Sequence, residues 1–287
     1  MERIKTGIPG FDELIQGGIP KGFNVLITGP PGAGKSIFSM QYLYNGALAG
    51  DPGLYLSLDS PKKNMIEQAS QFGWDFEKLE NENLISFFSI PPDRTRLNLF
   101  DMIEDIVAQT KAKRLAFDSL ATLMISIDQF AIPVSRLNQE KDVKQDLTIT
   151  PSTSTKKVNP LDYELLPNAE YDQKGRVFYS GNTEKRMIYL IMHELQTLGT
   201  TNVVITSSPE KETSKLTVDG VSEFAADGVI SLEVQEIAKK IVRSIRVRKM
   251  RNTNQDLDSF TFSLLNNGII IEGKKIFEGS KISGINP

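Results

Sequence analysis

The chain has 287 residues, of which 39% are hydrophobic and 24% charged, with a formal net charge of −3 at pH 7. This length and composition suit one large α/β domain with a sizeable core. The absence of cysteine excludes disulfides and thiolate metal sites, and the single histidine disfavours a histidine-based site. The chain lacks the basic excess of proteins that coat nucleic acid. It also lacks a signal region or a run of roughly 18 apolar residues, so we expect a cytoplasmic protein.

Short apolar runs alternate with segments of helical periodicity along the chain. Strands are predicted at 23–28, 54–58, 84–90, 114–118, 203–206, 229–232, 241–247 and 260–264. Helices are predicted over 35–49, from Pro61 to a stop at Gly73 with Ser60 as N-cap, and over 99–107 and 187–198. The alternation predicts an α/β fold with a mostly parallel central sheet flanked by helices. The closer spacing of the last runs predicts an antiparallel C-terminal extension.

The segment from about 126 to 184 breaks this pattern, because it has little periodicity and contains a Ser/Thr-rich stretch at 148–157. A structureless loop of this length is uncommon inside a compact domain. We interpret residues 1–287 as one domain with a partly flexible insertion at 126–184. Charges in the insertion are nearly balanced, which disfavours a dedicated DNA-binding loop.

A complete G-x-x-x-x-G-K-[ST] motif follows the first long strand and precedes a helix. Its residues are Gly29, Pro30, Pro31, Gly32, Ala33, Gly34, Lys35 and Ser36, followed by Ile37. Backbone N–H groups of such a loop and the helix N-terminus bind phosphate oxygens. Lys35 is expected to reach the β- and γ-phosphates, and Ser36 to place its hydroxyl on Mg²⁺. The motif therefore predicts ATP and Mg²⁺ as ligands.

Asp118 ends the apolar run RLAF. An acid at the C-terminal end of a parallel strand beside the phosphate loop can hold a magnesium-bound water. Asp118 and Ser36 are thus the predicted metal residues. The alternative is that Asp118 only caps the following turn.

Several further motifs closely resemble those of KaiC-like ATPases in the RecA superfamily. The segment Thr6–Leu14 (TGIPGFDEL) with Gly17–Gly22 resembles the family's entry into the phosphate loop. The other similar segments are FGWD at 72–75, DSL at 118–120, the region 219–230 and KMRNT at 249–253. Together they cover most of the chain apart from the insertion.

The resemblance implies a RecA-like P-loop fold, ATP bound between neighbouring subunits and a hexameric ring. It also implies that Lys249 and Arg251 reach the γ-phosphate of an adjacent subunit. Cations at that position stabilise the charge that develops during phosphoryl transfer. The alternative for both residues is a solvated strand face, which is our interpretation of Arg243, Arg246 and Arg248.

The chain departs from the family after the second strand, where relatives carry paired glutamates and this sequence has only Asp59. Asp59 is the predicted water-orienting residue, but a helix-entry acid is an equal alternative. Its shorter side chain displaces the carboxylate by about 1 Å, which can slow a reaction about a hundredfold. Thr206 or Ser207 stands where relatives have TTE, and either senses the γ-phosphate or caps a strand end.

These observations predict a slow ATPase that acts as an ATP-dependent regulatory or assembly switch. The alternatives are an ATP-binding module that does not hydrolyse and, less favoured, a recombinase-type DNA-dependent ATPase. The expected partners are other copies of the chain and a protein of unknown identity, with nucleic acid and membrane not expected.

Overall fold

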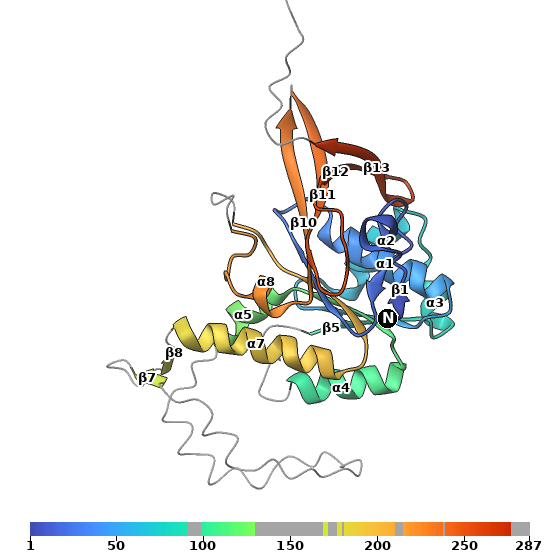
Figure 1. The fold of residues 1–287 in the computed structure, drawn as a ribbon. Helices are drawn as coiled ribbons and strands as arrows, with labels where there is room; N and C mark the ends of the chain where they lie inside the picture. The colour runs from blue at the N-terminus through green and yellow to red at the C-terminus, as the bar shows by residue number, and fades with distance from the viewer. Residues whose placement is uncertain are drawn as a thin grey trace, which may run out of the picture.

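The computed structural model describes residues 1–90, 99–129, 169–171, 177–179, 181–209, 215–237 and 239–276. Its main feature is a nine-stranded sheet with the strand order β13-β12-β11-β10-β3-β9-β6-β4-β5 (Figure 1). The strands from β10 to β5 run parallel, and β11, β12 and β13 continue the sheet in antiparallel pairs. The predicted α/β fold, with its antiparallel C-terminal extension, is confirmed.

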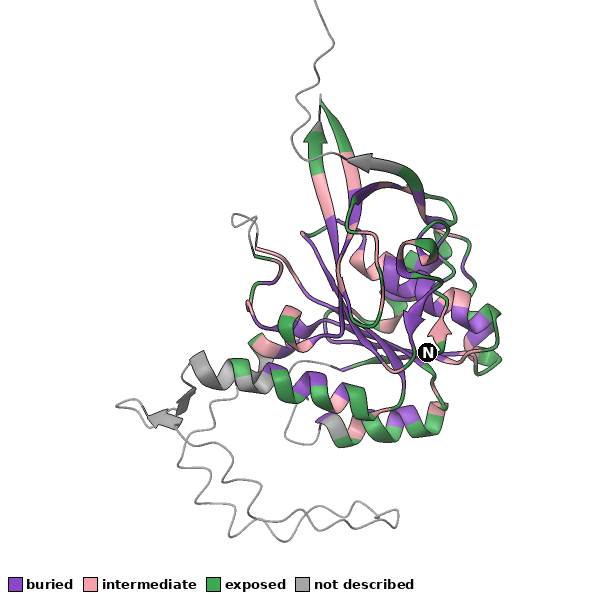
Figure 2. Cartoon of the chain, in the orientation of Figure 1, coloured by how far each residue is buried: buried purple, intermediate pink, exposed green. Residues whose placement is uncertain are grey.

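The centre of the sheet is apolar on both faces. Its strands are β3 (Asn24–Thr28), β9 (Thr201–Ile205), β6 (Arg114–Asp118), β4 (Gly53–Ser57) and β5 (Ile85–Ser89). Every residue of the first four is buried, as the purple centre of Figure 2 shows. A parallel sheet covered by helices on both faces selects such continuous apolar runs, which explains why these strands could be predicted.

Helices cover the two faces and create two cores. One face packs against α1 (Lys35–Leu48), α2 (Lys62–Ser70) and α3 (Phe76–Asn81). The other packs against α4 (Leu99–Thr110), α5 (Leu120–Gln129) and α7 (Gly181–Thr197). A short helix, α8 (Ser222–Ala225), precedes β10 (Gly228–Ile237).

The C-terminal extension consists of β10, β11 (Lys240–Met250), β12 (Ser259–Leu265) and β13 (Gly268–Ile276). The sequence reading missed β13. Its signal was present, because Asn267-Gly268 between apolar runs is a strong hairpin motif. Gly268 has φ of +108°, and it pairs with Leu265 across the turn.

Smaller elements also went unpredicted. They are β1 (Arg3–Ile4) paired with β2 (Ile19–Pro20), the 3-10 helix η1 (Asp12–Ile15), β7 (Ala169–Tyr171) paired with β8 (Val177–Tyr179), and the helices α3, α5 and α8. The strands, η1 and α8 are two to four residues long, too short to show periodicity, whereas α3 has six residues and α5 has ten.

The predicted start of α2 was wrong by one residue. Pro61, not Ser60, is the N-cap, and its backbone is extended with ψ of 147°. Ser60 instead belongs to the preceding turn, where its N–H donates to Ser57 Oγ at 2.9 Å.

The predicted insertion at 126–184 lies largely outside the described residues. At its edges, α5 extends to Gln129 and α7 begins at Gly181, so both limits fall within helices. Among the described residues, no helix is long and apolar enough to span a membrane.

Candidate functional site

The candidate site lies at one edge of the sheet, the edge formed by the carboxyl-terminal ends of the parallel strands β3, β6 and β4. These strands are parallel, with Ile27 beside Ile205, Phe117 beside Val204 and Ser57 beside Asp118. Residues that follow the three strands therefore meet at one edge, which is the usual ligand position in open α/β sheets. The predicted residues Lys35, Ser36, Asp59, Asp118 and Thr206 all derive from this edge.

The loop from Gly29 to Gly34 depends on glycine at specific positions. Gly29 has φ of +154°, and a Cβ there would lie 2.3 Å from the carbonyl oxygen of Leu232 on β10. Gly34 has φ of +103° and starts α1. A side chain at Gly29 would push the loop away from the sheet, so the motif's glycine fixes how closely loop and strand approach.

Lys35 folds back over the loop that precedes it. Its Nζ donates to the carbonyl oxygens of Gly29 at 2.8 Å and Pro30 at 3.0 Å. Burial lowers the pKa of Lys35, and the nearby carboxylates of Asp118 and Asp59 partly oppose this shift. The ammonium group is therefore a partly desolvated cation, which interacts more strongly with an anion than it would in water.

Asp118 is 9% exposed and receives two hydroxyl hydrogen bonds on the same oxygen. Ser36 Oγ donates to Asp118 Oδ2 at 2.9 Å, and Tyr55 Oη donates to it at 2.6 Å. Burial raises the pKa of Asp118, and these two hydrogen bonds counteract the shift. The structure thus brings together the serine and aspartate that the sequence predicted as metal residues.

These groups fit a magnesium ion. Hydroxyl and carboxylate oxygens are the ligands Mg²⁺ prefers, and Mg²⁺ usually keeps waters and binds substrate phosphates as well. Among the described residues there is no cluster of three or more His, Cys, Asp or Glu side chains that could hold a metal. A site of one serine and one aspartate is consistent with a metal that arrives with a nucleotide.

Asp59 lies beside this pair but in a more exposed position. Its Oδ1 accepts a hydrogen bond from Thr122 Oγ1 in the first turn of α5. Thr122 Oγ1 also lies 3.0 Å from Ser119 Oγ. The Asp59 carboxylate is therefore tethered to the start of α5 and does not cap α2.

Thr206 follows β9 and is 1% exposed. Its N–H donates to Ile27 at 3.0 Å, but its Oγ1 has no hydrogen-bond partner among the described residues. Ser207 accepts from the Val218 N–H at 3.0 Å through its carbonyl oxygen. A buried hydroxyl without a partner is costly, so of the two residues Thr206 has the stronger reason to meet a ligand oxygen.

Lys249 and Arg251 lie towards the opposite edge of the sheet. Lys249 is paired with Val229, and the Arg251 N–H donates to Asp227, whose N–H donates to Asn24 at the start of β3. Val229 is level with Leu26 in the middle of β3, so roughly 7 Å of strand for Lys249 and roughly 13 Å for Arg251 separate these residues from the end of β3. Neither residue lies at the phosphate loop of its own chain.

Both cations are held by groups of the α8 region. Lys249 Nζ donates to the carbonyl oxygens of Glu223, Phe224 and Ala226 at 3.1, 3.2 and 2.6 Å. Arg251 Nη1 lies 2.9 Å from Asp227 Oδ1. Burial lowers the pKa of Lys249, and the neighbouring Arg251 adds to the shift.

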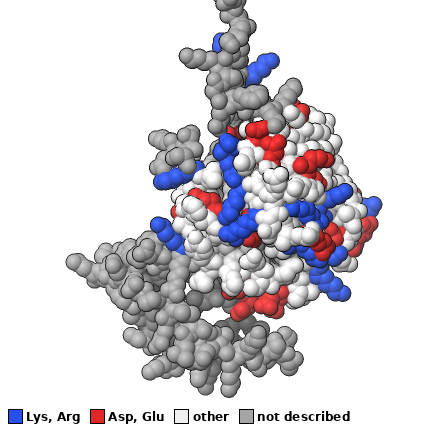
Figure 3. Space-filling view, viewed as in Figure 1, with Lys and Arg blue, Asp and Glu red and all other residues white. Residues whose placement is uncertain are grey.

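Basic side chains form a band along the β10–β11 hairpin (Figure 3). The contributing strand β11 has the sequence KIVRSIRVRKM. Arg248 is paired with Glu233 at 2.7 Å, and Arg246 Nε donates to the Leu257 carbonyl at 2.7 Å. These intrachain partners fit our interpretation of Arg246 and Arg248 as residues of a strand face.

The sequence reading missed Tyr55 and Thr122. A tyrosine inside a buried strand needs a partner for its hydroxyl, and this was the only available signal for Tyr55. Thr122 gave no signal, because its contact with Asp59 joins residues 63 positions apart.

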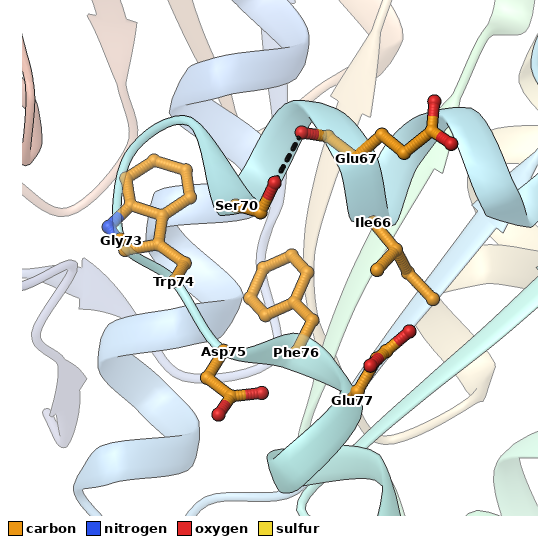
Figure 4. Close-up of a pocket in the computed structure, with 8 residues that line it drawn as sticks. All are labelled: Ile66, Glu67, Ser70, Gly73, Trp74, Asp75, Phe76 and Glu77. Atoms are coloured by element: carbon orange, nitrogen blue, oxygen red, sulfur yellow. Dashed lines mark hydrogen bonds between the residues drawn. The ribbon is translucent and has the colours of Figure 1, made fainter.

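A separate pocket of about 400 Å³ lies between α2 and α3 (Figure 4). Its lining residues are Ile66, Glu67, Ser70, Gly73, Trp74, Asp75, Phe76 and Glu77. None of them belongs to the phosphate loop, β6 or β11, so this pocket is distinct from the candidate site.

The sheet, the loop after β3 and the carboxylate at the end of β6 define a P-loop ATPase of the RecA superfamily. The family model described as "ATPase: KaiC" matches residues 4–137 and 180–276. The chain therefore belongs to the KaiC ATPase family.

Individual relatives support this assignment. A UPF0273 protein from Aeropyrum pernix is 28% identical over 301 aligned positions, covering 99% of each chain. The circadian clock oscillator protein KaiC of Prochlorococcus marinus is 27% identical, and the match covers 94% of this chain but 45% of that protein. The crystal structure of the KaiC-like protein PH0186 from Pyrococcus horikoshii OT3 aligns with a TM-score of 0.69 and 29% identity, covering 94% of this chain and 98% of that one.

Proposed function

We propose that the protein binds ATP with Mg²⁺ and hydrolyses it slowly, acting as an ATP-dependent regulatory or assembly switch. The observation that carries this proposal is the convergence of Lys35, Ser36, Asp118 and Asp59 at one edge of the sheet. P-loop hydrolysis requires a cation at the phosphates, residues that bind the metal and a residue that orients the attacking water.

Each residue has a distinct part in the proposed reaction. Backbone N–H groups of residues 29–36 hold the phosphates, and Lys35 exchanges its carbonyl partners for the β- and γ-phosphate oxygens. Ser36 and Asp118 would hold Mg²⁺, which would supply positive charge next to the phosphates. The buried hydroxyl of Thr206 is available to a γ-phosphate oxygen.

Asp59 orients the attacking water. Its tether to Thr122 fixes the carboxylate, but the side chain is one methylene shorter than glutamate. A displacement of about 1 Å can lower a rate about a hundredfold, and this is the basis for expecting slow turnover.

Lys249 and Arg251 are proposed to act on the nucleotide of a neighbouring copy in a ring. Their place at the sheet edge opposite the phosphate loop supports contact in trans. Phe224, beside Lys249, is 64% exposed, and an exposed aromatic next to such cations suits a subunit contact.

Phosphate release by the purified protein tests the proposal. Asp59→Ala should reduce turnover at least about tenfold while ATP affinity, measured by calorimetry, stays within about threefold of the unsubstituted protein. Asp105→Ala is the matched control, since Asp105 is an exposed acid on α4. Unchanged turnover in Asp59→Ala would remove Asp59 from the mechanism.

Two comparisons separate the alternative functions. Tight ATP binding without phosphate release would identify a module that binds ATP without hydrolysing it. Tight single-stranded DNA binding at physiological salt would favour a DNA-dependent ATPase.

A further inference from the structure

Tyr55 is a buried polar residue that none of the roles above requires. It lies in the middle of β4 with 1% of its surface exposed. On the neighbouring strand β6 it is paired with Ala116. The small alanine leaves room for the tyrosine ring to extend along β6 towards Asp118, which lies on the same face two residues later.

The hydroxyl of Tyr55 donates a hydrogen bond to the carboxylate of Asp118. Both hydrogen bonds that described residues give to this carboxylate, from Tyr55 and Ser36, fall on Oδ2. Two donors on one oxygen restrain the rotation of the carboxylate, and its second oxygen remains an acceptor for other donors.

The two donors differ in how freely they can move. Ser36 has a short side chain at the start of α1, and its hydroxyl rotates to suit its partner. The Tyr55 ring is stacked on Phe87 with centroids 5.9 Å apart, and Phe87 in turn packs on Phe76 at 5.1 Å. When Ser36 turns to the metal, Tyr55 remains as the donor that packing holds in place.

We propose that Tyr55 is a positioning residue, which holds the Asp118 carboxylate in the orientation needed to bind the magnesium–nucleotide complex. This inference rests on the proposed function. It predicts that Tyr55 contributes to the share of nucleotide affinity that depends on metal, and not to the share that the phosphate loop supplies alone.

Tyr55→Phe removes the hydroxyl and keeps the packed ring. The affinity for a non-hydrolysable ATP analogue is measured by calorimetry with saturating Mg²⁺ and with EDTA. The dissociation constant in EDTA divided by that in Mg²⁺ gives the ratio that reports the contribution of the metal. We expect Tyr55→Phe to lower this ratio about tenfold, the size of a hydrogen bond to a charged group, with the dissociation constant in EDTA unchanged.

Tyr42→Phe is the matched control. Tyr42 is also fully buried, and its hydroxyl donates to the Thr201 carbonyl at 3.1 Å, at the opposite edge of the sheet. Its ratio should match that of the unsubstituted protein. An unchanged ratio in Tyr55→Phe, or equal losses in both variants, would overturn the positioning role.

The proposed function can fail separately. If the unsubstituted protein does not bind the analogue under either condition, ATP binding itself is wrong, and the role of Tyr55 falls with it. If the unsubstituted protein shows a strong metal dependence that Tyr55→Phe retains, only the inference on Tyr55 is overturned. Melting temperatures of both variants verify that each is folded.

Discussion

The charged groups at the two edges of the central sheet differ in the partners that hold them. At the β3–β6–β4 edge, Lys35 donates to a carbonyl oxygen of the phosphate loop, and Ser36 donates to Asp118. The positive charge of Lys35 lies close to the negative charge of Asp118. At the other edge, Lys249 and Arg251 are bound by groups of the α8 region. Under the proposed function, the first edge binds phosphate within one chain, whereas the cations of the second edge serve a site on another copy.

The largest expected effect concerns the first edge. Lys35→Ala should weaken ATP binding at least about a hundredfold, because it removes a partly desolvated cation from the phosphate oxygens. Calorimetric titration measures the affinity. Lys113→Ala is the control, since Lys113 is an exposed lysine paired with Asp51 far from the loop. Equal affinities in both variants would contradict a phosphate role for Lys35.

The next prediction tests whether the two edges belong to different copies. Lys249→Ala should lower turnover about a hundredfold, within the range of cations that act in trans, and leave ATP affinity unchanged. In an equal mixture of Lys35→Ala and Lys249→Ala chains, random assembly makes about one interface in four complete. Phosphate release should therefore recover to about a quarter of normal. A mixture no more active than its components would argue against contact in trans.

A smaller effect is expected from Asp118. Because burial raises its pKa above the unfolded value of 3.8, the folded state favours the protonated form. The contribution of the Asp118 carboxyl to the free energy of unfolding is fully present below the pKa of the unfolded state. It is lost as pH rises through the pKa of the folded state. Asp118→Asn should therefore raise the melting temperature of the nucleotide-free protein by roughly 2 °C at neutral pH.

The pH dependence is the control for this prediction. The stability difference between Asp118→Asn and the unsubstituted protein should shrink as pH falls from about 7.5 to about 4.5. Calorimetric melting at both pH values measures it. A difference that does not change with pH would show that the substitution acts through packing rather than charge.

The smallest effect compares two ion pairs on or beside β11. Arg251 is 52% exposed and pairs with Asp227, and Arg248 is 26% exposed and pairs with Glu233. Arg251→Ala and Arg248→Ala should each cost less than about 1 kcal/mol in the free energy of unfolding, measured with denaturant. Only Arg251→Ala should also lower turnover. Equal turnover losses would favour a general role for the basic strand.

Features set by local chemistry were predictable from the sequence. The buried strands, the loop at 29–36 and the start of α1 each depend on neighbouring residues, namely apolar runs and glycines that permit positive φ. Asp118 could be placed because parallel strands end at the same edge. The glycine-dependent β13 hairpin was missed although its signal is also local.

Only the tertiary structure decided how these parts meet. The sequence determined that a phosphate loop exists and that Asp118 faces it. Strand register decided that Tyr55 reaches Asp118 and that Thr122 tethers Asp59, contacts between residues 63 positions apart. The antiparallel return of β11 decided that Lys249 and Arg251 lie at the far edge. Such long-range contacts depend on the order and register of strands, which residue patterns along the chain do not specify.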